Sequence, residues 1–467
     1  MNKKRRVYGE HLTPTEVFEN FILPEIEDKI YNYIWVDLFA GEGNLVLPIL
    51  ELIPEKDRID FFRKHIFLFD IQKEMVERAI ENTAKYGIPK DIAEKNIIQR
   101  DTIKDYPEFL LNLELPIYHI TNPPYLHKSF ISRYEETKKY LECFKGENKR
   151  YQDLYHLALI NDLKHRIEKM IYIIPSNFLF GNISTKKIRY DLLQYYYIKK
   201  AIILEKQIFN YTGVNVIVSF FERKSKPKHE TISFEGIKIN REVKKRTYIL
   251  EPNNYYKAGK EFEEFVNNYQ AIKPIFIKYY LDIEEVEKNK GDYEIEVIDA
   301  NSYTRTGYKK KKIYVNREMY EKIKSNILFV KSIDTGNMNG RAGLYKIKDI
   351  FGVDGILVTT DRYRSHPIQI FFNPTLTEEE QILLRDYFNT VLEYFREKTD
   401  SEFLTTYKYS NSQYTRKTLG LSQTRKLIKT FPWLSLNDEE KDIFKKLIES
   451  KNIEEIISFI KNKNKKE

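Results

Sequence analysis

The run Asn122-Pro123-Pro124-Tyr125 directly follows the apolar stretch 115–121. The Asn122 amide oxygen accepts hydrogen bonds, and Pro124 holds the residue before it extended, so the Pro123 carbonyl can be a second acceptor. Two convergent acceptors fit one NH₂ group, and the face of Tyr125 suits a flat ring. These residues predict a site for a heterocycle with an exocyclic amine. The alternative is a rigid loop that caps a strand.

An amine of this kind is a weak nucleophile because its lone pair is delocalised into the ring. Accepting both of its N–H bonds localises that lone pair on the nitrogen, which can then attack a sulfonium methyl group. The enzyme would contribute positioning and electrostatic preorganisation. We therefore predict a methyl transfer that uses neither a metal nor a covalent intermediate.

A glycine-bearing turn lies upstream, in the stretch 36–44 (VDLFAGEGN). Gly41 and Gly43 let the backbone turn sharply and approach a ligand closely. Position 46 is Val and no Lys-Ser/Thr pair follows, so the dinucleotide fingerprint and the phosphate loop are both incomplete. A tight strand-to-helix turn without a ligand remains the alternative.

Two acids stand where later apolar runs end. Asp70 follows the run 65–69 and Asp101 follows 96–100. The first could accept the hydroxyls of a ribose and the second an adenine amino group; Asp70 could also be a helix N-cap. Together with the glycine turn they outline an adenosine pocket that lacks a group to hold a pyrophosphate. This favours S-adenosyl-L-methionine over a dinucleotide as the cofactor.

The elements that must position these residues alternate along the first half of the chain. Apolar runs predict strands at 33–41, 65–71, 96–101, 117–125, 169–181, 199–205 and 214–224, with helical patterns at 44–53, 73–88 and 153–169. Such alternation indicates βαβ units and a parallel sheet covered on both faces. The predicted fold class is therefore α/β, a Rossmann-like domain whose ligands bind beyond the carboxyl ends of the strands.

The polar, basic stretch 223–236 predicts a domain boundary near residue 230. We expect a methyltransferase domain over 1–230 and a second, α+β domain over 231–467. The second domain contains three basic stretches, 304–317, 361–369 and 406–426, with Tyr, Asn, Gln and Ser among their residues. Such residues contact phosphates and base edges, which favours target recognition on DNA; each stretch could also be solvated surface.

Composition limits the classes of protein that remain. The 467 residues are 42% hydrophobic and 31% charged, with a net charge of +9, which permits a nucleic-acid partner. The single cysteine, Cys143, excludes a disulfide framework and a cysteine-rich zinc site. We expect a cytoplasmic protein without a secretory signal, a membrane partner or a bound metal.

Over residues 8 to 225 the motifs resemble those of amino-methyltransferases that act on DNA, most closely the adenine-N6 enzymes of restriction–modification systems. DLFAGEG and NPPY are the specific matches, and the motif order is that of the gamma class. The resemblance implies that Asn122, Pro123, Pro124 and Tyr125 are catalytic. It implies cofactor contacts at Thr13, Pro14, Phe39, Gly41, Gly43, Asp70 and Asp101, with Asp37 supporting the turn.

Three further stretches resemble the family more loosely. In 152–160, Asp153, Leu154 and Tyr155 keep the start of the D-L-Y-x-x-F motif, but Ala158 replaces its Phe. The stretch 173–181 resembles the family's Pro-bearing strand end. The stretch 208–224 resembles a hairpin whose aromatic residue, here Phe209, packs on the flipped adenine opposite Tyr125; a core aromatic is the alternative.

The resemblance implies a type II enzyme that uses S-adenosyl-L-methionine on double-stranded DNA. It would act as a monomer and protect its site from a separate cognate restriction endonuclease. Cytosine-N4 methyltransferases usually carry Ser at the first motif position, and glutamine-N5 protein methyltransferases are much shorter chains. RNA guanine-N2 enzymes usually end the motif in Phe. A non-catalytic DNA-binding specificity protein would not be expected to retain both motifs intact.

Overall fold

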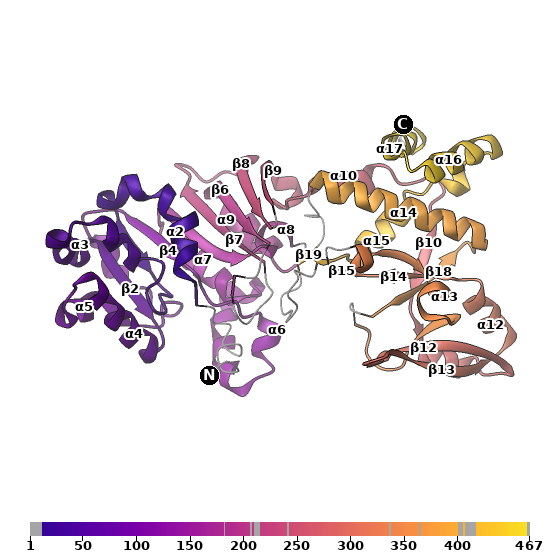
Figure 1. Cartoon of the computed structure of the whole chain (residues 1–467), viewed down its shortest axis with the longest axis horizontal. Helices are drawn as coiled ribbons and strands as arrows, with labels where there is room; N and C mark the ends of the chain where they lie inside the picture. Colours follow the sequence, from indigo (N-terminus) through magenta and orange to yellow (C-terminus); the bar gives the residue numbers. More distant parts are fainter. Residues whose placement is uncertain are drawn as a thin grey trace. The chain divides into compact units, whose positions relative to one another are not determined.

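The computed structural model describes residues 12–181, 183–205, 208–209, 215–240, 242–335, 338–363, 366–399, 405–406 and 417–464. They form two compact units, of which the first runs to Ala258 and the second begins at Gly259 (Figure 1). Every helix in these ranges is too short or too polar to cross a lipid bilayer.

The first unit is built on one nine-stranded sheet in the order β3-β2-β1-β4-β5-β7-β6-β8-β9. The strands are β1 (Ile34–Asp37), β2 (Ile66–Asp70), β3 (Ile97–Gln99), β4 (Ile117–Thr121), β5 (Lys169–Pro175), β6 (Tyr196–Leu204), β7 (Val216–Arg223), β8 (Ile232–Ile239) and β9 (Val243–Leu250). Strands β1 to β5 are parallel, and β7 is inserted antiparallel between β5 and β6. The predicted Rossmann-like α/β fold is confirmed.

Strand order reverses at β1, which lies between β2 and β4. The carboxyl ends of these three strands therefore meet at one edge of the sheet, where parallel α/β sheets bind ligands. All seven strands predicted before residue 225 are present, and β1, β2 and β4 are buried along their whole length. Continuous burial of this kind is typical of strands covered on both faces.

Helices connect the strands and cover the sheet. They are α2 (Thr15–Phe21), α3 (Arg58–His65), α4 (Lys73–Thr83), α5 (Lys90–Asn96), α6 (Lys128–Ile131), α7 (Leu154–Lys164), α8 (Asn177–Phe180) and α9 (Lys186–Leu193). The helix predicted at 44–53 is a 3₁₀ segment over Leu47–Leu52, which stops before Pro54 because proline cannot continue a helix.

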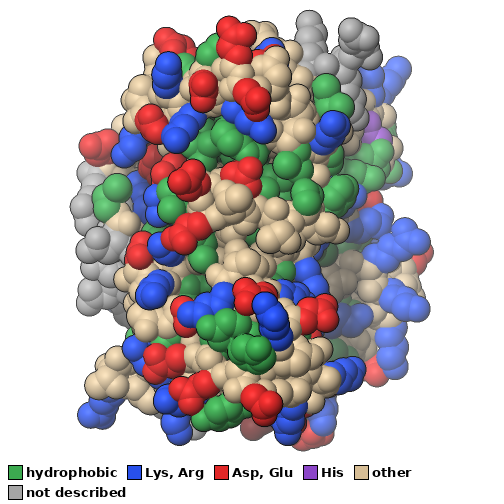
Figure 2. All heavy atoms as spheres, turned by 90° about the vertical axis from the view of Figure 1, so that its right-hand side faces the viewer, with side chains coloured by type: hydrophobic (Ala, Val, Ile, Leu, Met, Phe, Trp, Pro, Cys, Tyr) green, Lys and Arg blue, Asp and Glu red, His purple; other side chains and the backbone are tan. Residues whose placement is uncertain are grey.

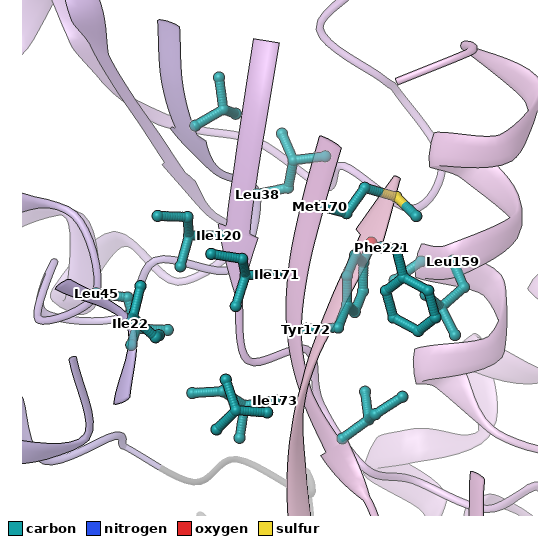
Figure 3. Packing of buried hydrophobic residues seen from close by; sticks show 14 of the residues in the cluster. Ile22, Leu38, Leu45, Ile120, Leu159, Met170, Ile171, Tyr172, Ile173 and Phe221 are labelled. Atoms are coloured by element: carbon teal, nitrogen blue, oxygen red, sulfur yellow. The ribbon is translucent and has the colours of Figure 1, made fainter. Parts of the chain in front are cut away.

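Central strand β5 shows how the two faces are filled (Figure 3). Met170 and Tyr172 point towards Leu159 of α7, whereas Ile171 and Ile173 point to the opposite side. All four side chains are fully buried. The same strand therefore supports two layers of core, one on each face of the sheet.

The first unit extends 28 residues beyond the boundary expected at residue 230. Strand β8 pairs in parallel with β6, so the hairpin β8–β9 completes the sheet. Buried Arg189 of α9 then donates to the carbonyl oxygens of Phe178 (2.8 Å) and Tyr255 (3.0 Å), and the Ala258 N–H donates to Leu179 O (3.0 Å). The polar stretch after residue 223 is a loop between β7 and β8.

The second unit is α+β, as predicted, and contains three small sheets. The first sheet has the strand order β10 (Phe276–Tyr279), β18 (Ile368–Asn373), β14 (Leu328–Lys331) and β16 (Gly343–Lys346). The second has the order β11 (Leu281–Asp282), β17 (Gly355–Val358), β12 (Tyr293–Thr304) and β13 (Gly307–Val315). The third has the order β15 (Ile333–Asp334), β20 (Lys417–Thr418) and β19 (Thr405–Thr406).

Eight helices are described in this unit: α10 (Lys260–Asn268), α11 (Ile283–Lys288), α12 (Arg317–Lys324), α13 (Ile347–Phe351), α14 (Glu378–Thr399), α15 (Leu421–Ile428), α16 (Asp438–Ser450) and α17 (Ile453–Lys463). Helix α14 buries Leu384, Tyr387, Phe388 and Val391 in the core of this unit. Acidic and basic side chains are interspersed over the exposed face in Figure 2.

Candidate active site

The glycine turn follows β1 directly and is fastened to β2. The Ala40 N–H donates to the Phe69 carbonyl oxygen (2.8 Å), and the Gly43 N–H donates back to Ala40 O (2.8 Å). Gly41 and Gly43 adopt φ angles of +55° and +84°, in the left-handed region that favours glycine. The sequence therefore needs glycine at both positions for the turn to close over the end of the strand.

Asp37 joins this turn to the strand that carries the NPPY run. Its Oδ1 accepts from the Phe39 N–H (2.9 Å) and from the Thr121 hydroxyl (2.5 Å), and Thr121 immediately precedes Asn122. Burial raises the pKa of Asp37 to about 6, against the lowering effect of the Thr121 hydrogen bond. Asp37 thus holds the ends of β1 and β4 together. Its support of a turn that binds the cofactor stays a prediction.

Asp70 closes the other side of the turn. Its Oδ2 accepts from the Gly41 N–H (2.9 Å) and its Oδ1 from the Gln72 N–H (2.9 Å). Burial raises the pKa of its carboxyl group. The N-cap of α4 is Gln72 and not Asp70, so the alternative interpretation of Asp70 as that helix cap is wrong. Its carboxylate connects the end of β2 to the glycine turn.

The Asn122 side chain is held at both ends of its amide. Its Nδ2 donates to the Thr13 hydroxyl (2.9 Å), and the Tyr125 hydroxyl hydrogen-bonds to its Oδ1. The same hydroxyl lies 2.8 Å from the Ile173 carbonyl oxygen at the end of β5. These contacts fix the orientation of the amide, with its oxygen on the side of Tyr125.

The two predicted aromatic residues lie together but are closed off in this structure. Tyr125 is 1% exposed and Phe209 is 3% exposed, and their ring centroids are 6.4 Å apart at 62°. Tyr155 meets Tyr125 edge-on at 6.2 Å. Neither ring offers an open face to a ligand here, so the stacking expected of them stays a prediction.

One cavity of about 810 Å³ brings the ends of β1 to β4 together. Predicted residues on its wall are Phe39, Gly41, Asp70, Asp101, Asn122 and Pro124. A smaller adjoining cavity of about 280 Å³ shares Phe39, Gly41 and Asn122 with it and adds Thr13 and Asp37. Pro14, Gly43, Pro123, Tyr125 and Phe209 line neither cavity.

Apolar wall residues were missing from the sequence prediction. Ile71 and Ile103 line the larger cavity close behind the two acids Asp70 and Asp101, and Ile71 is 37% exposed. Met75 and Tyr140 also belong to this lining, together with Leu154 of the D-L-Y stretch, which sequence had already pointed to. An apolar residue close behind each acid was the available signal, because a strand that ends in an acid places the following residues beside the same ligand.

A buried polar network lies behind the glycine turn. Asp162 of α7 accepts from His119 Nδ1 (2.5 Å) and from the hydroxyls of Tyr172 (2.6 Å) and Tyr106 (3.2 Å). The Leu38 N–H in turn donates to His119 Nε2 (3.3 Å), which requires the His119 proton to be on Nδ1. Burial raises the pKa of both tyrosines, so they remain donors at neutral pH.

Solved structures of low sequence identity match parts of this chain. The type IIL restriction–modification enzyme MmeI in complex with DNA is 13% identical over 96% of this chain and 71% of its own, with a TM-score of 0.55. A modification subunit of a putative type I restriction enzyme from Vibrio vulnificus YJ016 is 16% identical over 66% of this chain and 59% of its own, with a TM-score of 0.37.

A type I methyltransferase subunit from Streptococcus thermophilus is 17% identical over 49% of this chain and 48% of its own, with a TM-score of 0.36. The chain therefore spans 59% and 48% of the lengths of these two type I subunits. A search among curated proteins finds no match. A family profile described as N-6 DNA Methylase matches residues 1–343. The chain belongs to the N-6 DNA methylase family.

Proposed function

We infer that this chain transfers a methyl group from S-adenosyl-L-methionine to the N6 amino group of adenine in double-stranded DNA. The observation that carries the inference is the position of Asn122 on the wall of the same cavity as Gly41 and Asp70. A predicted amine-binding amide and a predicted adenosine pocket thus share one space, although they are far apart in sequence. Membership of the N-6 DNA methylase family supports the choice of DNA.

The donor set of the cavity fits S-adenosyl-L-methionine. Asp70 and Asp101 on its wall suit a ligand that carries positive charge. The guanidinium of Arg100 is already paired with Asp105 (2.8 Å), which leaves the acids dominant. Backbone N–H groups occupy part of the roughly four acceptor sites of the Asp70 carboxylate, so a site remains for a ribose hydroxyl.

We assign each predicted cofactor residue a specific contact with S-adenosyl-L-methionine or with the turn that binds it. Asp70 would accept the ribose hydroxyls and Asp101 the adenine amino group, between the apolar side chains of Ile71 and Ile103. Phe39, Gly41 and Gly43 would form the turn against the ligand, with Asp37 bracing it. Thr13 and Pro14 would contact the methionine part. The ligand, when bound, supplies an electrophilic methyl group.

The residues of the NPPY run would act on the adenine amine. Asn122 Oδ1 has a second lone pair besides the one that faces the Tyr125 hydroxyl, so it can accept one N–H of the amine. The Pro123 carbonyl oxygen would accept the other. Both bonds strengthen as the nitrogen becomes positive during attack, which stabilises the transition state more than the ground state.

Adenine must leave the duplex to reach this site, at a cost of a few kcal/mol in stacking. Tyr125 and Phe209 would recover part of that cost by holding the base between their faces. Their rings now pack against each other, so they must separate before a base lies between them. The 210–214 stretch of this hairpin lies outside the described residues.

The biological setting belongs to the same proposal. The cofactor motifs precede NPPY and the second unit follows both, which is the gamma order. Two neighbouring structures are named as subunits of type I restriction systems and one as a type IIL enzyme. We assign this chain to type II restriction–modification, as a monomer whose cognate restriction endonuclease is a separate protein.

One assay separates this function from its rivals. The protein is incubated with methyl-labelled S-adenosyl-L-methionine and unmethylated duplex DNA, and the digested nucleosides are identified by mass spectrometry. We expect 6-methyladenine. 4-Methylcytosine would move the chain to the cytosine-N4 enzymes, and label only in added protein would move it to the glutamine methyltransferases. A chain that binds DNA but transfers no label would be a non-catalytic specificity protein.

A further inference from the structure

A wide groove crosses the second unit and is not used by the methyl-transfer site. Its volume is about 920 Å³, at the upper end of the roughly 300–1,000 Å³ of small-molecule pockets. Its walls come from the end of β12, the start of β13, β14, helix α13 and residues 366–367.

The lining of this groove is cationic without any acidic counterpart. Lys310 and Lys331 are on its wall, and no Asp or Glu is among the described residues that line it. The whole chain has 69 acidic and 78 basic residues, and the face in Figure 2 shows both signs interspersed. The absence of acids is therefore a property of the groove and favours a polyanionic partner.

Lys310 keeps its charge available. The two lysines that follow it on β13 are neutralised, because Lys311 pairs with Asp299 (2.5 Å) and Lys312 with Glu294 (2.7 Å). Lys310 has no ion pair with any residue that the structure describes. An exposed, unpaired lysine in an acid-free groove is suited to contact a phosphate.

Rings and a polar side chain add the means to recognise bases. Tyr303 is 71% exposed, and its ring meets Tyr308 edge-on at 4.8 Å, which in turn meets Phe351 at 5.8 Å. Among the described residues, His366 Nδ1 is buried without a hydrogen-bond partner. Burial lowers the pKa of His366, so the neutral ring offers one donor and one acceptor at pH 7.

The groove is lined by residues of two of the three basic stretches that sequence marked separately. The stretch 304–317 contributes Thr306, Tyr308 and Lys310, and 361–369 contributes His366 and Pro367. From 406–426, strand β20 pairs with β15, whose Ile333 lines the groove. Residues 407–416 lie outside the described part of the chain. Two segments separated by about 50 residues in sequence thus meet at one surface.

We propose that this groove is the surface through which the second unit reads duplex DNA, with Lys310 on a phosphate and Tyr303 and His366 at base edges. The proposal rests on the function inferred above and adds to it the residues that choose the sequence. Duplex DNA matches both the positive charge of the groove and its mixture of donors, acceptors and rings.

Lys310→Ala in the full-length protein tests the phosphate contact. Binding of a fluorescent duplex, measured by anisotropy from 50 to 200 mM salt, should weaken, and the slope of log K against log[salt] should fall in magnitude by about 1. Lys309→Ala is the matched control, because the adjacent exposed lysine on β13 does not line the groove. Equal effects of the two substitutions would overturn the phosphate contact.

His366→Ala and Tyr303→Ala test base recognition. Methylated positions are mapped on unmethylated genomic DNA, with Tyr314→Ala, an exposed tyrosine outside the groove, as control. We expect His366→Ala to accept additional bases at one or more positions of the site, and Tyr303→Ala to lower kcat/KM by about tenfold or more. An unchanged map with unchanged kcat/KM would overturn the proposal.

These experiments distinguish a failure of the proposed methyl transfer from a failure of the groove assignment. If wild-type protein binds S-adenosyl-L-methionine but methylates no DNA, the proposed function fails. If wild type methylates DNA and the groove variants match their controls, only the groove assignment fails. Unchanged cofactor affinity in each variant, measured by calorimetry, shows that the first unit is intact.

Discussion

At the scale of single residues, two side chains each connect separate segments of the candidate site by hydrogen bonds. Asp70 fastens the glycine turn to β2 and lines the cavity, and Asn122 links Thr13 to Tyr125. Sequence identified both residues because an acid or amide at a strand tip has a recognisable chemistry. It did not identify Ile71 or Ile103, because an apolar residue carries no such signature.

Asp70→Ala should weaken binding of S-adenosyl-L-methionine by about 10- to 100-fold, because hydrogen bonds to a charged group contribute about 1.5–3 kcal/mol. Calorimetry on the purified protein measures the affinity. Asp91→Ala, an exposed acid in the first turn of α5, is the control. Affinity equal to that of the control would remove Asp70 from the cofactor pocket.

Asp37 should make stability depend on pH. Burial raises its pKa in the folded protein from 3.8 to about 6, so the folded state binds more protons than the unfolded state between these values. Its contribution is therefore largest below pH 3.8 and is lost as pH rises through 6. From pH 5 to 7 the free energy of unfolding should fall by about 1 kcal/mol more in wild type than in Asp37→Asn.

Urea unfolding at both pH values provides this comparison. The Asn side chain keeps an oxygen for the Phe39 N–H and the Thr121 hydroxyl, so the variant should fold. Other titrating groups are the same in the two proteins and cancel in the difference. An identical change with pH in both proteins would mean that Asp37 is already ionised throughout this range.

At the scale of elements, the sequence predicted the strands of the first unit but not the side-chain contacts that hold strands and helices together. All seven expected strands of the first unit are present because each is a short apolar run between turns. The pairing of His119 on β4 with Asp162 on α7 could not be read from sequence, since the residues are 43 positions apart and each also looks like an ordinary residue of its own element.

Asp162→Asn tests whether this network supports the glycine turn. An amide presents N–H groups to donors that now face a carboxylate, which should cost about 1–3 kcal/mol of unfolding free energy and weaken cofactor binding through Leu38. Tyr106→Phe removes only the longest bond, of 3.2 Å, and should cost less. Chemical denaturation and calorimetry measure the two effects. Equal, negligible losses in both variants would show that the network is not structural.

At the scale of the whole molecule, the chain consists of two compact units, and each contains one candidate binding surface. The first supplies the cavity at the carboxyl ends of its strands, and the second supplies the acid-free groove. Sequence placed the division near residue 230, whereas the first unit continues to Ala258. Local polarity cannot reveal that a hairpin joins a sheet whose other strands precede it, because strand pairing is a tertiary property.

The net charge of +9 should make DNA binding far more sensitive to salt than cofactor binding. Raising salt from 50 to 200 mM should reduce affinity for a duplex by at least about tenfold, corresponding to two or more neutralised phosphates. Affinity for S-adenosyl-L-methionine should change much less, because that ligand lies in a cavity with apolar walls. Equal salt dependence for both ligands would argue against phosphate contacts by the protein.

Methyl transfer by Asn122→Ala tests the central claim most directly, with cofactor affinity measured on the same preparation. We predict that transfer to duplex DNA falls at least about 100-fold, as when a transition-state hydrogen bond is removed, while the Kd for S-adenosyl-L-methionine is nearly unchanged. Asn20→Ala, an exposed asparagine on α2, should behave as wild type. Normal methylation by Asn122→Ala would contradict the account, because no other side chain is assigned to hold the amine.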